Sequence, residues 1–379
     1  MSAEKSAACN VGGQAVIEGV MMRSPRSFAV VCRRPGGEIV MREERWHSIW
    51  DRMKLLRWPF FRGGVVLLEA LVNGMSALSF SARQQEEHQV APAALATDTG
   101  DERSATAPDS ADSADSADSG GKATSAASFT GVIVLSIAMA MGLFVALPHL
   151  LTWLIGLKTD SFAFHLVDGG IKVTILVAYI GGIGLMKEIR RVYMYHGAEH
   201  KSIYAYEKDL ELNVENSRVQ SRFHPRCGTS FLVMVILVSV FLFAVLLRHP
   251  LSSSTLVDHL LKILIKIPLM FPVAGLSYEG IKLSGKYRDN SVVGVLVTPG
   301  LWLQRLTTRE PTDDQLEIAI LALRKTLWRE QVAEDVAQHG GVQVYASYSE
   351  ALLGAFGKTR EEAGRSQILC TELPRTLRG

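Results

Sequence analysis

The sequence predicts a mainly α-helical protein that crosses a membrane about four times, with a small β-containing cytosolic unit at its N-terminus and a cytosolic helix near its C-terminus. Apolar residues gather in long uninterrupted runs, a short N-terminal segment reads as strands and turns, and helical spacing of leucines follows the last run. The chain has 379 residues and a formal net charge of only +2. This balance argues against a specific nucleic-acid-binding protein.

The first predicted unit, residues 1–57, contains a β-hairpin. The segments Arg26–Arg34 and Glu38–Glu44 flank Pro35-Gly36-Gly37. Glycine adopts the positive φ that a tight turn requires, so these two segments are expected to pair as strands.

Residues 58–82 have apolar residues at helical spacing, broken by Glu69 and Asn73. The Trp-Pro-Phe-Phe-Arg sequence at their start suits a lipid headgroup region. We therefore expect an interfacial or bundle-packing helix, with a fifth membrane span as the alternative. Residues 83–128 contain the repeat SADSADSADS and almost no large apolar residues, which predicts a disordered linker.

Residues 129–289 form the predicted membrane domain. About 20 apolar residues cross the roughly 30 Å of hydrocarbon in a bilayer. Lys262 and Lys266 lie near the start of the last run, where their side chains are expected to snorkel towards water. Because the runs contain few polar residues that would line a path, a channel is a weaker interpretation. The four runs are Phe129–Leu157, Ile171–Met186, Ser230–Leu247 and Leu256–Leu283.

The distribution of basic residues predicts the orientation. Lysine and arginine concentrate in the segment 190–229 and after the fourth run, which places that segment and both termini in the cytosol. No signal peptide is expected, since Glu18 and Arg23 interrupt the first apolar stretch. The cysteines lack the spacing of a CxxC motif and would face a reducing compartment, so no disulfide is expected. They are Cys9, Cys32, Cys227 and Cys370.

The C-terminal segment, residues 290–338, contains a second kind of helix. Thr-Asp-Asp-Gln from Thr312 follows Pro311 and matches a capping box. An apolar row at three- and four-residue steps then predicts an amphipathic cytosolic helix. Residues 339–379 have a weak pattern and are expected to form a weakly ordered tail. The apolar row is Leu316, Ile320, Leu323 and Leu327.

The pentapeptide His196-Gly-Ala-Glu199-His200 is the strongest chemical signal in the chain. On a helix the two imidazoles at i and i+4 share one face with Glu199 beside them, as in the inverted zinc-hydrolase arrangement H-x-x-E-H. His224 and Cys227 follow on the same predicted loop. Zinc binds imidazole nitrogen and thiolate sulfur. We expect a divalent metal ion, zinc first, at His196 and His200 with His224, and with Cys227 as a fourth ligand or a near neighbour.

Three interpretations of this cluster remain open. With three protein ligands, a metal-bound water would fill the fourth position and Glu199 would act as its general base, which is hydrolytic chemistry. With four protein ligands the ion would be a structural staple. Without a metal, the histidines would bond lipid phosphates and backbone groups at a helix end.

Two further carboxylates are candidates. Glu18 lies in a mostly apolar stretch, where a solvated position at a strand edge is the alternative to a functional one. Glu279 lies near the cytosolic end of the fourth run, where an ionisable group is a functional candidate or a partner of Lys282. Tyr206 and Glu207 are weaker candidates for partners of the metal ligands.

Four longer motifs stand out along the chain. They are GGQAVIEGVMMR at Gly12–Arg23, YHGAEHK at Tyr195–Lys201, HPRCGTSF at His224–Phe231 and PGLWLQRLTTREP at Pro299–Pro311. Together they resemble the YqhQ-type family of bacterial membrane proteins (domain of unknown function 1385), loosely described as predicted metal-dependent enzymes. The resemblance covers roughly residues 10–330 apart from the linker. It implies a multi-pass protein of the bacterial inner membrane with a metal site at His196, Glu199, His200, His224 and Cys227.

Two functions of different classes follow. The first is a zinc-preferring hydrolase at the cytosolic membrane face, acting on a peptide or a lipid-linked substrate. The second is a non-catalytic scaffold or assembly factor with a structural His/Cys metal site, which docks a cytosolic or translocation-related protein partner. The fourth coordination position distinguishes them, since an open position favours the enzyme and a closed site favours the scaffold.

Overall fold

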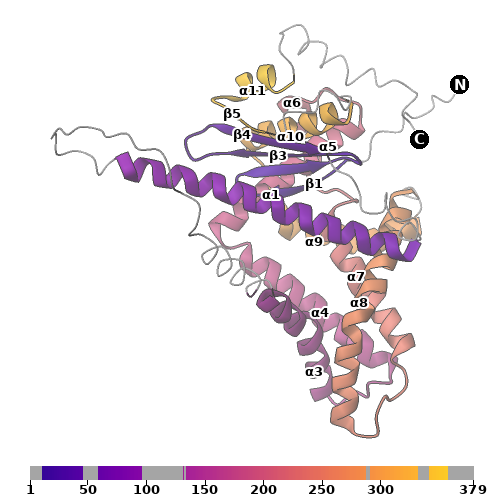
Figure 1. Ribbon diagram of the computed structural model, residues 1–379. Coiled ribbons are helices and arrows are strands. Elements are labelled where there is room, and N and C mark those ends of the chain that lie inside the picture. Colours follow the sequence, from indigo (N-terminus) through magenta and orange to yellow (C-terminus); the bar gives the residue numbers. More distant parts are fainter. Residues whose placement is uncertain are drawn as a thin grey trace, which may run out of the picture. The chain divides into compact units, whose positions relative to one another are not determined.

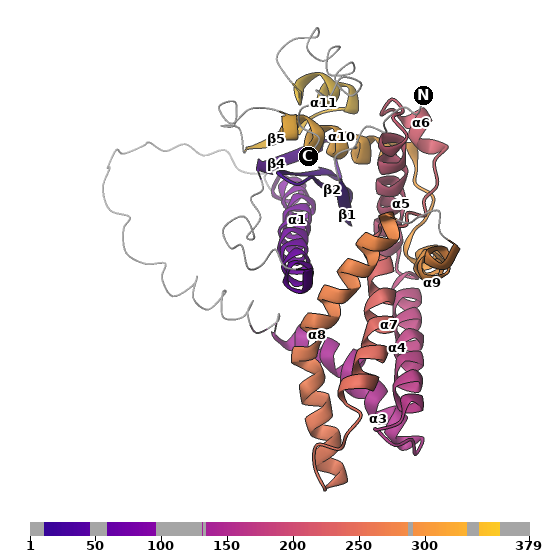
Figure 2. The ribbon, with the colours of Figure 1, turned by 90° about the vertical axis from the view of Figure 1, so that its right-hand side faces the viewer.

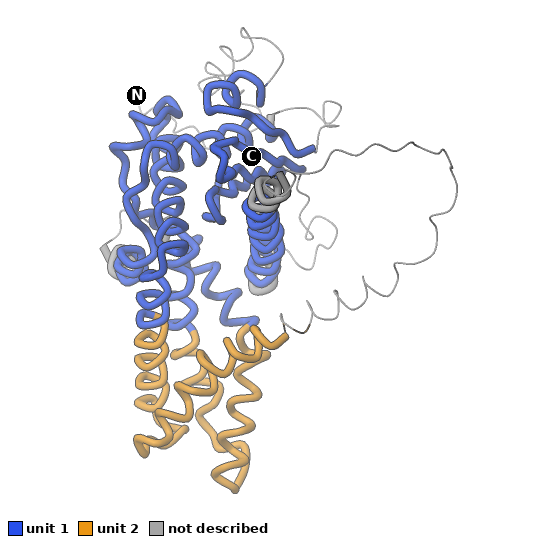
Figure 3. Tube along the Cα trace, turned by 90° about the vertical axis from the view of Figure 1, so that its left-hand side faces the viewer, with its two compact units in different colours: residues 1–90, 177–238, 271–379 blue, residues 91–176, 239–270 orange. Residues whose placement is uncertain are grey.

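The computed structural model describes residues 11–45, 59–95, 131, 134–286, 291–331 and 341–356. The chain divides into two compact units, shown in Figure 3. Unit 1 comprises residues 1–90, 177–238 and 271–379, and unit 2 comprises residues 91–176 and 239–270. The predicted linker beyond residue 95, Cys9, Cys370 and the tail from residue 357 lie outside the described residues.

Unit 1 contains a five-stranded antiparallel sheet in the order β1-β2-β3-β4-β5 (Figure 1). The predicted hairpin is confirmed as β3 and β4, with Val31 opposite Met41 and Gly37 at φ 92° in the turn. The hairpin of β1 and β2 was not predicted, because its glycine-rich first strand lacks clear alternation. The strands are β1 (Gly12–Val16), β2 (Gly19–Arg23), β3 (Ser27–Arg33), β4 (Ile39–Arg45) and β5 (Val342–Tyr345).

The fifth strand corrects the prediction of a weakly ordered tail from residue 339. Val342 pairs with Arg42 and Tyr345 pairs with Ile39, and a short helix, α11 (Tyr348–Gly354), follows. A partner about 300 residues away in sequence supplies the order that the local pattern does not indicate.

Both faces of the sheet are covered by helices. Successive residues of a strand point to opposite faces, so Val20 and Val31 face one side while Met21 and Val30 face the other. The first set shares a buried cluster with residues of helices α5 (Lys187–Glu207) and α10 (Asp313–Gln331). The second set packs against Ala77 and other residues of helix α1 (Pro59–Leu95). Figure 1 shows α1 running beneath the sheet, and Figure 2 shows the same helix nearly end-on.

Helix α10 is the predicted C-terminal helix. The backbone N–H of Thr312 donates to Gln315 Oε1 at 3.0 Å, which is one half of the predicted capping box. The predicted apolar row is buried, and so are Ile318 and Ala322 on the remaining sides. The helix is therefore buried on several sides in the core of unit 1, whereas the sequence predicted an amphipathic helix with a single apolar face.

Within the part of the chain that the structure describes, five helices are long and apolar enough to cross a membrane. The sequence predicted four spans, with a fifth at residues 58–82 as the alternative interpretation. Helix α1 is the fifth candidate by length and composition. It extends to Leu95, through residues that were predicted to be linker. The second predicted run began at Ile171, whereas helix α4 begins at Phe162. The five segments are Gly63–Glu86, Val134–Leu154, Phe162–Ile183, Gly228–Leu246 and Thr255–Leu283.

The remaining helices connect these segments. A π-helical turn, η3 (Gly142–Ala146), precedes α3 (Leu147–Leu154). Short helix α6 (Val214–Arg218) follows α5. The boundaries between the two units fall inside α1, α4, α7 and α8. The other bounds are α4 (Phe162–Ile183), α7 (Gly228–Leu246), α8 (Thr255–Lys286) and α9 (Ser291–Thr307).

The segment after α9 runs directly against α5. The backbone N–H of Arg309 donates to the carbonyl of Tyr193 at 2.9 Å. A Cβ added at Gly197 would lie 2.1 Å from the Arg309 carbonyl oxygen. Only glycine fits at this point of the HGAEH sequence, because a backbone atom occupies the space of a side chain.

We predict that Gly197→Ala destabilises the protein by about 1–3 kcal/mol through overpacking. Thermal unfolding of the full chain in detergent measures the effect. Gly182→Ala is the matched control, since nothing lies within 4 Å of its added Cβ, and it should change stability by about 1 kcal/mol or less. Equal melting temperatures for the two variants would contradict the close contact.

Candidate metal centre

The HGAEH sequence lies inside helix α5, as predicted. The rings of His196 and His200 are 4.4 Å apart between centroids, so both project from one face of the helix. Cys227 reaches the same place from the loop before α7. One ligand atom from each of these three residues lies within 4.8 Å of the other two.

Backbone carbonyls orient both imidazoles. His196 Nδ1 lies 2.9 Å from the carbonyl oxygen of Thr307, and His200 Nδ1 lies 2.5 Å from that of Arg222. Because a carbonyl oxygen only accepts, each Nδ1 carries the proton and each Nε2 keeps a lone pair. Metal-binding histidines are commonly oriented in this way.

The two free nitrogens face the cysteine. His196 Nε2 lies 3.1 Å from Cys227 Sγ. His200 Nε2 is buried and makes no hydrogen bond to any residue that the structure describes. A buried imidazole nitrogen with an available lone pair is costly unless something binds it.

The electrostatic environment favours the protonation states that metal ligands need. Burial lowers the pKa of His200, which favours the neutral imidazole. Burial acts to raise the pKa of Cys227, but the nearby His200 ring and the donors of Thr229 lower it below its ordinary value. The Thr229 backbone N–H donates to Sγ at 3.4 Å and the hydroxyl lies 3.2 Å away. These donors stabilise a thiolate.

The spacing of the three donors fits a tetrahedral ion. Bond lengths of about 2.0 Å to nitrogen and about 2.3 Å to sulfur place tetrahedral donors about 3.3–3.5 Å apart. The distance of 3.1 Å between His196 Nε2 and Cys227 Sγ is close to this value, and all three separations are below 4.8 Å. Movements of about 1 Å or less would bring the three residues into zinc geometry.

Glu199 lies under strand β1. A Cβ added at Gly13 would lie 2.8 Å from the carboxyl carbon of Glu199 and 2.8 Å from the backbone carbonyl oxygen of Met21, so glycine is required there. Oε2 is buried and has no hydrogen-bond partner among the residues described. Burial raises the pKa of Glu199 to about 8, against the opposing effects of His196 and the Gly13 backbone. This carboxyl group can therefore exchange a proton near neutral pH.

His224 has a different set of contacts. Its Nε2 lies 3.2 Å from Glu207 Oε1, and its ring is 5.6 Å from that of His200. Burial acts to raise the pKa of Glu207, but His224 and Arg226 lower it to about 2. The structure thus groups Cys227, and not His224, with the two histidines of α5, while Glu207 is the direct partner of His224.

Gln304 of α9 holds the loop that carries His224, and sequence reasoning missed it. It is fully buried; its Nε2 donates to the His224 carbonyl at 2.7 Å and to Ser230 Oγ at 3.1 Å. Its Oε1 accepts from the His224 backbone N–H at 2.8 Å. The available signal was a glutamine between apolar residues in the PGLWLQRLTTREP motif.

Neither of the two additional carboxylates belongs to the group of three ligand residues. Glu18 has φ 49° in the turn between β1 and β2, and it pairs with Arg191 of α5. The Tyr195 hydroxyl donates to it at 3.3 Å. Glu18, which was expected either at a solvated strand edge or in a functional position, therefore forms an ion pair that links the β1–β2 hairpin to α5. Glu279 lies partly buried in α8.

Comparisons with known proteins agree with the motifs. Residues 58–329 match the family described as "Protein of unknown function (DUF1385)". The chain is 32% identical over 329 residues to "Uncharacterized protein YqhQ" of Bacillus subtilis (strain 168), a match that covers 85% of this chain and 94% of that protein. No solved structure matches significantly. The chain therefore belongs to the DUF1385 family of proteins of unknown function.

Proposed function

We propose that this protein is a membrane-bound zinc hydrolase with its metal at His196, His200 and Cys227. The observation that carries the proposal is the pair of Nδ1 contacts to backbone carbonyls, which leave both Nε2 atoms directed at one thiol. Imidazole and thiolate together favour zinc over the harder magnesium and calcium ions.

A bound zinc ion would supply a Lewis acid and an activated water. In this proposal the three ligands hold the ion, and Glu199 takes up a proton at Oε2, the oxygen without a partner in the described structure. Gly13 and the rest of β1 keep this carboxyl group out of bulk water, which raises its affinity for the proton. Peptide and lipid-linked substrates are equally compatible with a site at a membrane surface.

A non-catalytic scaffold is the second candidate. The burial of Glu199 and His200, which are 4% and 1% exposed, favours it, because a substrate needs access to the metal. A rotation of His224 away from Glu207 would supply a fourth ligand and close the site. The ion would then link α5 to the start of α7 and stabilise the fold. In this case the protein would bind a protein partner instead of a substrate.

We propose that the protein lies in the inner membrane with both termini cytosolic, and helix α1 supports a position of the sheet beside a membrane surface. Its face away from the sheet is apolar and exposed, while its buried face carries Glu69 in an ion pair with Arg23 of β2 at 2.9 Å. A helix with one apolar face suits the headgroup layer, where the sheet would stay on the aqueous side. The exposed residues are Leu67, Leu68, Leu71, Val72, Met75 and Leu78.

The first prediction concerns metal content. Full-length protein purified in detergent with controlled zinc should contain about one zinc per chain, and X-ray absorption should report two nitrogen ligands and one sulfur ligand. His200→Ala should lose the metal, because a ligand is removed. His249→Ala, at an exposed histidine, should retain it. Metal-free wild type, or full retention in His200→Ala, would refute the metal site.

The second prediction separates the enzyme from the scaffold. Glu199→Gln should retain zinc and lower hydrolysis of a panel of fluorogenic peptides and esters by about 100-fold or more, as expected for loss of a general base. A water ligand in the absorption spectrum should accompany the activity. Zinc held by four protein ligands, with no hydrolysis by wild type, would favour the scaffold.

A further inference from the structure

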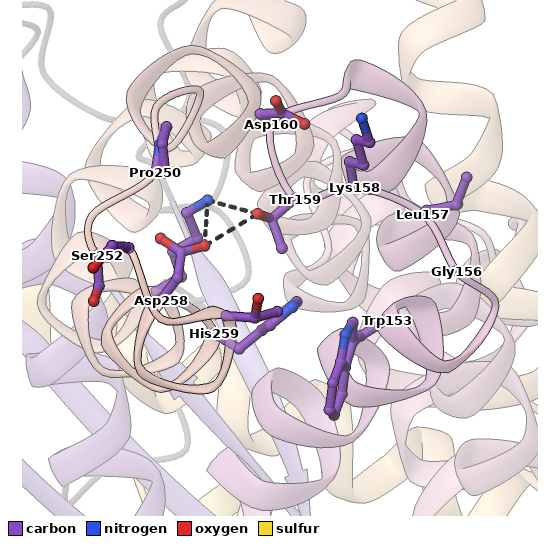
Figure 4. Close-up of a pocket in the computed structure, with 13 residues that line it drawn as sticks. Trp153, Gly156, Leu157, Lys158, Thr159, Asp160, Pro250, Ser252, Asp258 and His259 are labelled. Atoms are coloured by element: carbon purple, nitrogen blue, oxygen red, sulfur yellow. Dashed lines mark hydrogen bonds and ion pairs between the residues drawn. The ribbon is translucent and has the colours of Figure 1, made fainter.

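Unit 2 contains a pocket of about 400 Å³ at the ends of α3 and α8 (Figure 4). Asp258 and His259 from α8 lie on one side of it, and Thr159 from the loop after α3 lies beside Asp258, with its hydroxyl donating to Oδ2 at 3.2 Å. His259 is only 7% exposed, so its ring also extends into the protein. It is the first member of a row of buried polar groups.

The row continues from the pocket wall into the interior of unit 2. His259 Nδ1 lies 3.0 Å from His149 Nε2, and His149 Nδ1 lies 3.1 Å from Lys266 Nζ. Lys266 Nζ is 3.4 Å from Asp168 Oδ2, which also accepts from Lys172 Nζ at 2.6 Å. Three helices, α3, α4 and α8, supply these five side chains.

The lysines of α8 do not snorkel, contrary to the sequence prediction. Lys266 is 0% exposed and Lys262 is 1% exposed. Lys262 pairs with Asp258 at 2.9 Å and donates to Thr159 at 2.7 Å. Each lysine is thus held by groups of the protein, which is how a charge is retained in an apolar segment.

The charges around Lys266 are unequal. Lys262 and Asp258 form a neutral pair, but Lys266 and Lys172 share the single carboxylate of Asp168. A buried excess charge is costly in a region of low dielectric constant. Loss of one proton from Lys266 would leave the group neutral and would remove the cost of the buried excess charge.

The hydrogen bonds fix a direction along the row. Protonated Lys266 only donates, so His149 Nδ1 must accept from it and His149 Nε2 carries the hydrogen. That hydrogen is donated to His259 Nδ1, and the second hydrogen of the His259 ring is then on Nε2. One charged amine sets the tautomers of both imidazoles.

We propose that this row is a proton-exchange site, in which Lys266 takes up and releases one proton to the pocket through His149 and His259. On release, Lys266 Nζ gives a proton to His149 Nδ1, His149 Nε2 gives its proton to His259 Nδ1, and His259 Nε2 gives its proton to pocket water. One proton leaves, both imidazoles change tautomer and remain neutral, and uptake is the reverse. The site is independent of the metal centre.

Every packed element contributes to the environment of Lys266. Helix α4 supplies Asp168, Lys172 and His165, whose two ring nitrogens are buried without a hydrogen bond to any described residue. Oδ1 of Asp168 is also buried and accepts no hydrogen bond from any described residue. Helix α7 supplies the uncharged ring of Phe243, whose centroid is 5.4 Å from Nζ. His149 comes from α3, and Lys262 and His259 come from α8 itself.

The test is ¹⁵N NMR of full-length protein with labelled histidine, between about pH 5 and pH 10, because the nitrogen shifts report the tautomer directly. Signals of the two histidines are assigned with His149→Phe and His259→Phe. In wild type both rings should change tautomer with one common midpoint. Constant tautomers across the whole range, or two unrelated midpoints, would overturn the proposal.

Lys266→Arg is the decisive variant, since arginine keeps its proton throughout this range. Its two histidines should stay in the tautomer with hydrogen on Nε2 at every pH. Lys158→Arg, an exposed lysine at the pocket, is the matched control and should switch as wild type does. A switch in Lys266→Arg like that of wild type would overturn the proposal.

Asp168→Asn provides a second variant if Lys266→Arg fails to fold. Removal of the carboxylate that favours charged Lys266 should move the common midpoint down by about one pH unit or more. An unchanged midpoint would show that the tautomers respond to some other group and would overturn the assignment of Lys266.

Discussion

The close approach of backbone to helix α5 on two sides is the constraint on which the candidate metal centre depends. Strand β1 meets the helix at Gly13, over Glu199, and the segment after α9 meets it at Gly197. The second approach also places the Thr307 carbonyl on the His196 ring. Both contacts leave no room for a Cβ. The main chain of residue 309 packs on the main chain of α5 at Gly197, and the main chain of Gly13 packs on the Glu199 carboxyl group, so close backbone packing fixes the positions of the histidines and of the carboxyl group.

Local sequence signals predicted the elements that local interactions determine. The Pro35-Gly36-Gly37 turn, the capping box at Thr312 and the helix around HGAEH were all predicted from residues close in sequence. The association of His196 and His200 with Cys227 was expected as well, and Glu207 was a weaker candidate for a partner of the ligands. The support from Gln304 was not predicted, because it depends on how the loop that carries His224 packs against α9. The spacing of the ligands in the sequence does not show how this loop packs against α9.

Hydropathy predicted where the apolar segments lie, but it did not predict the role of the polar residues inside them. The start of α4 was placed too late because His165 and Asp168 lower the hydropathy of its first turns. A hydropathy scale assigns each such polar residue the free-energy cost of exposure to hydrocarbon. It does not include the ion pair that the residue forms with a side chain on another helix. Lys172 and Lys266 are those partners of Asp168. The same limitation hid the polar row, since its members come from three separate segments.

Strand β5 has a consequence for the edge of the sheet. It pairs along β4 from Ile39 to Arg42, on the side of β4 that β3 does not occupy. Without β5, the backbone N–H and C=O groups on this side of β4 would be unpaired and available to a strand of another chain. Residues from the far end of the sequence thus satisfy the hydrogen-bonding groups of a strand close to its beginning.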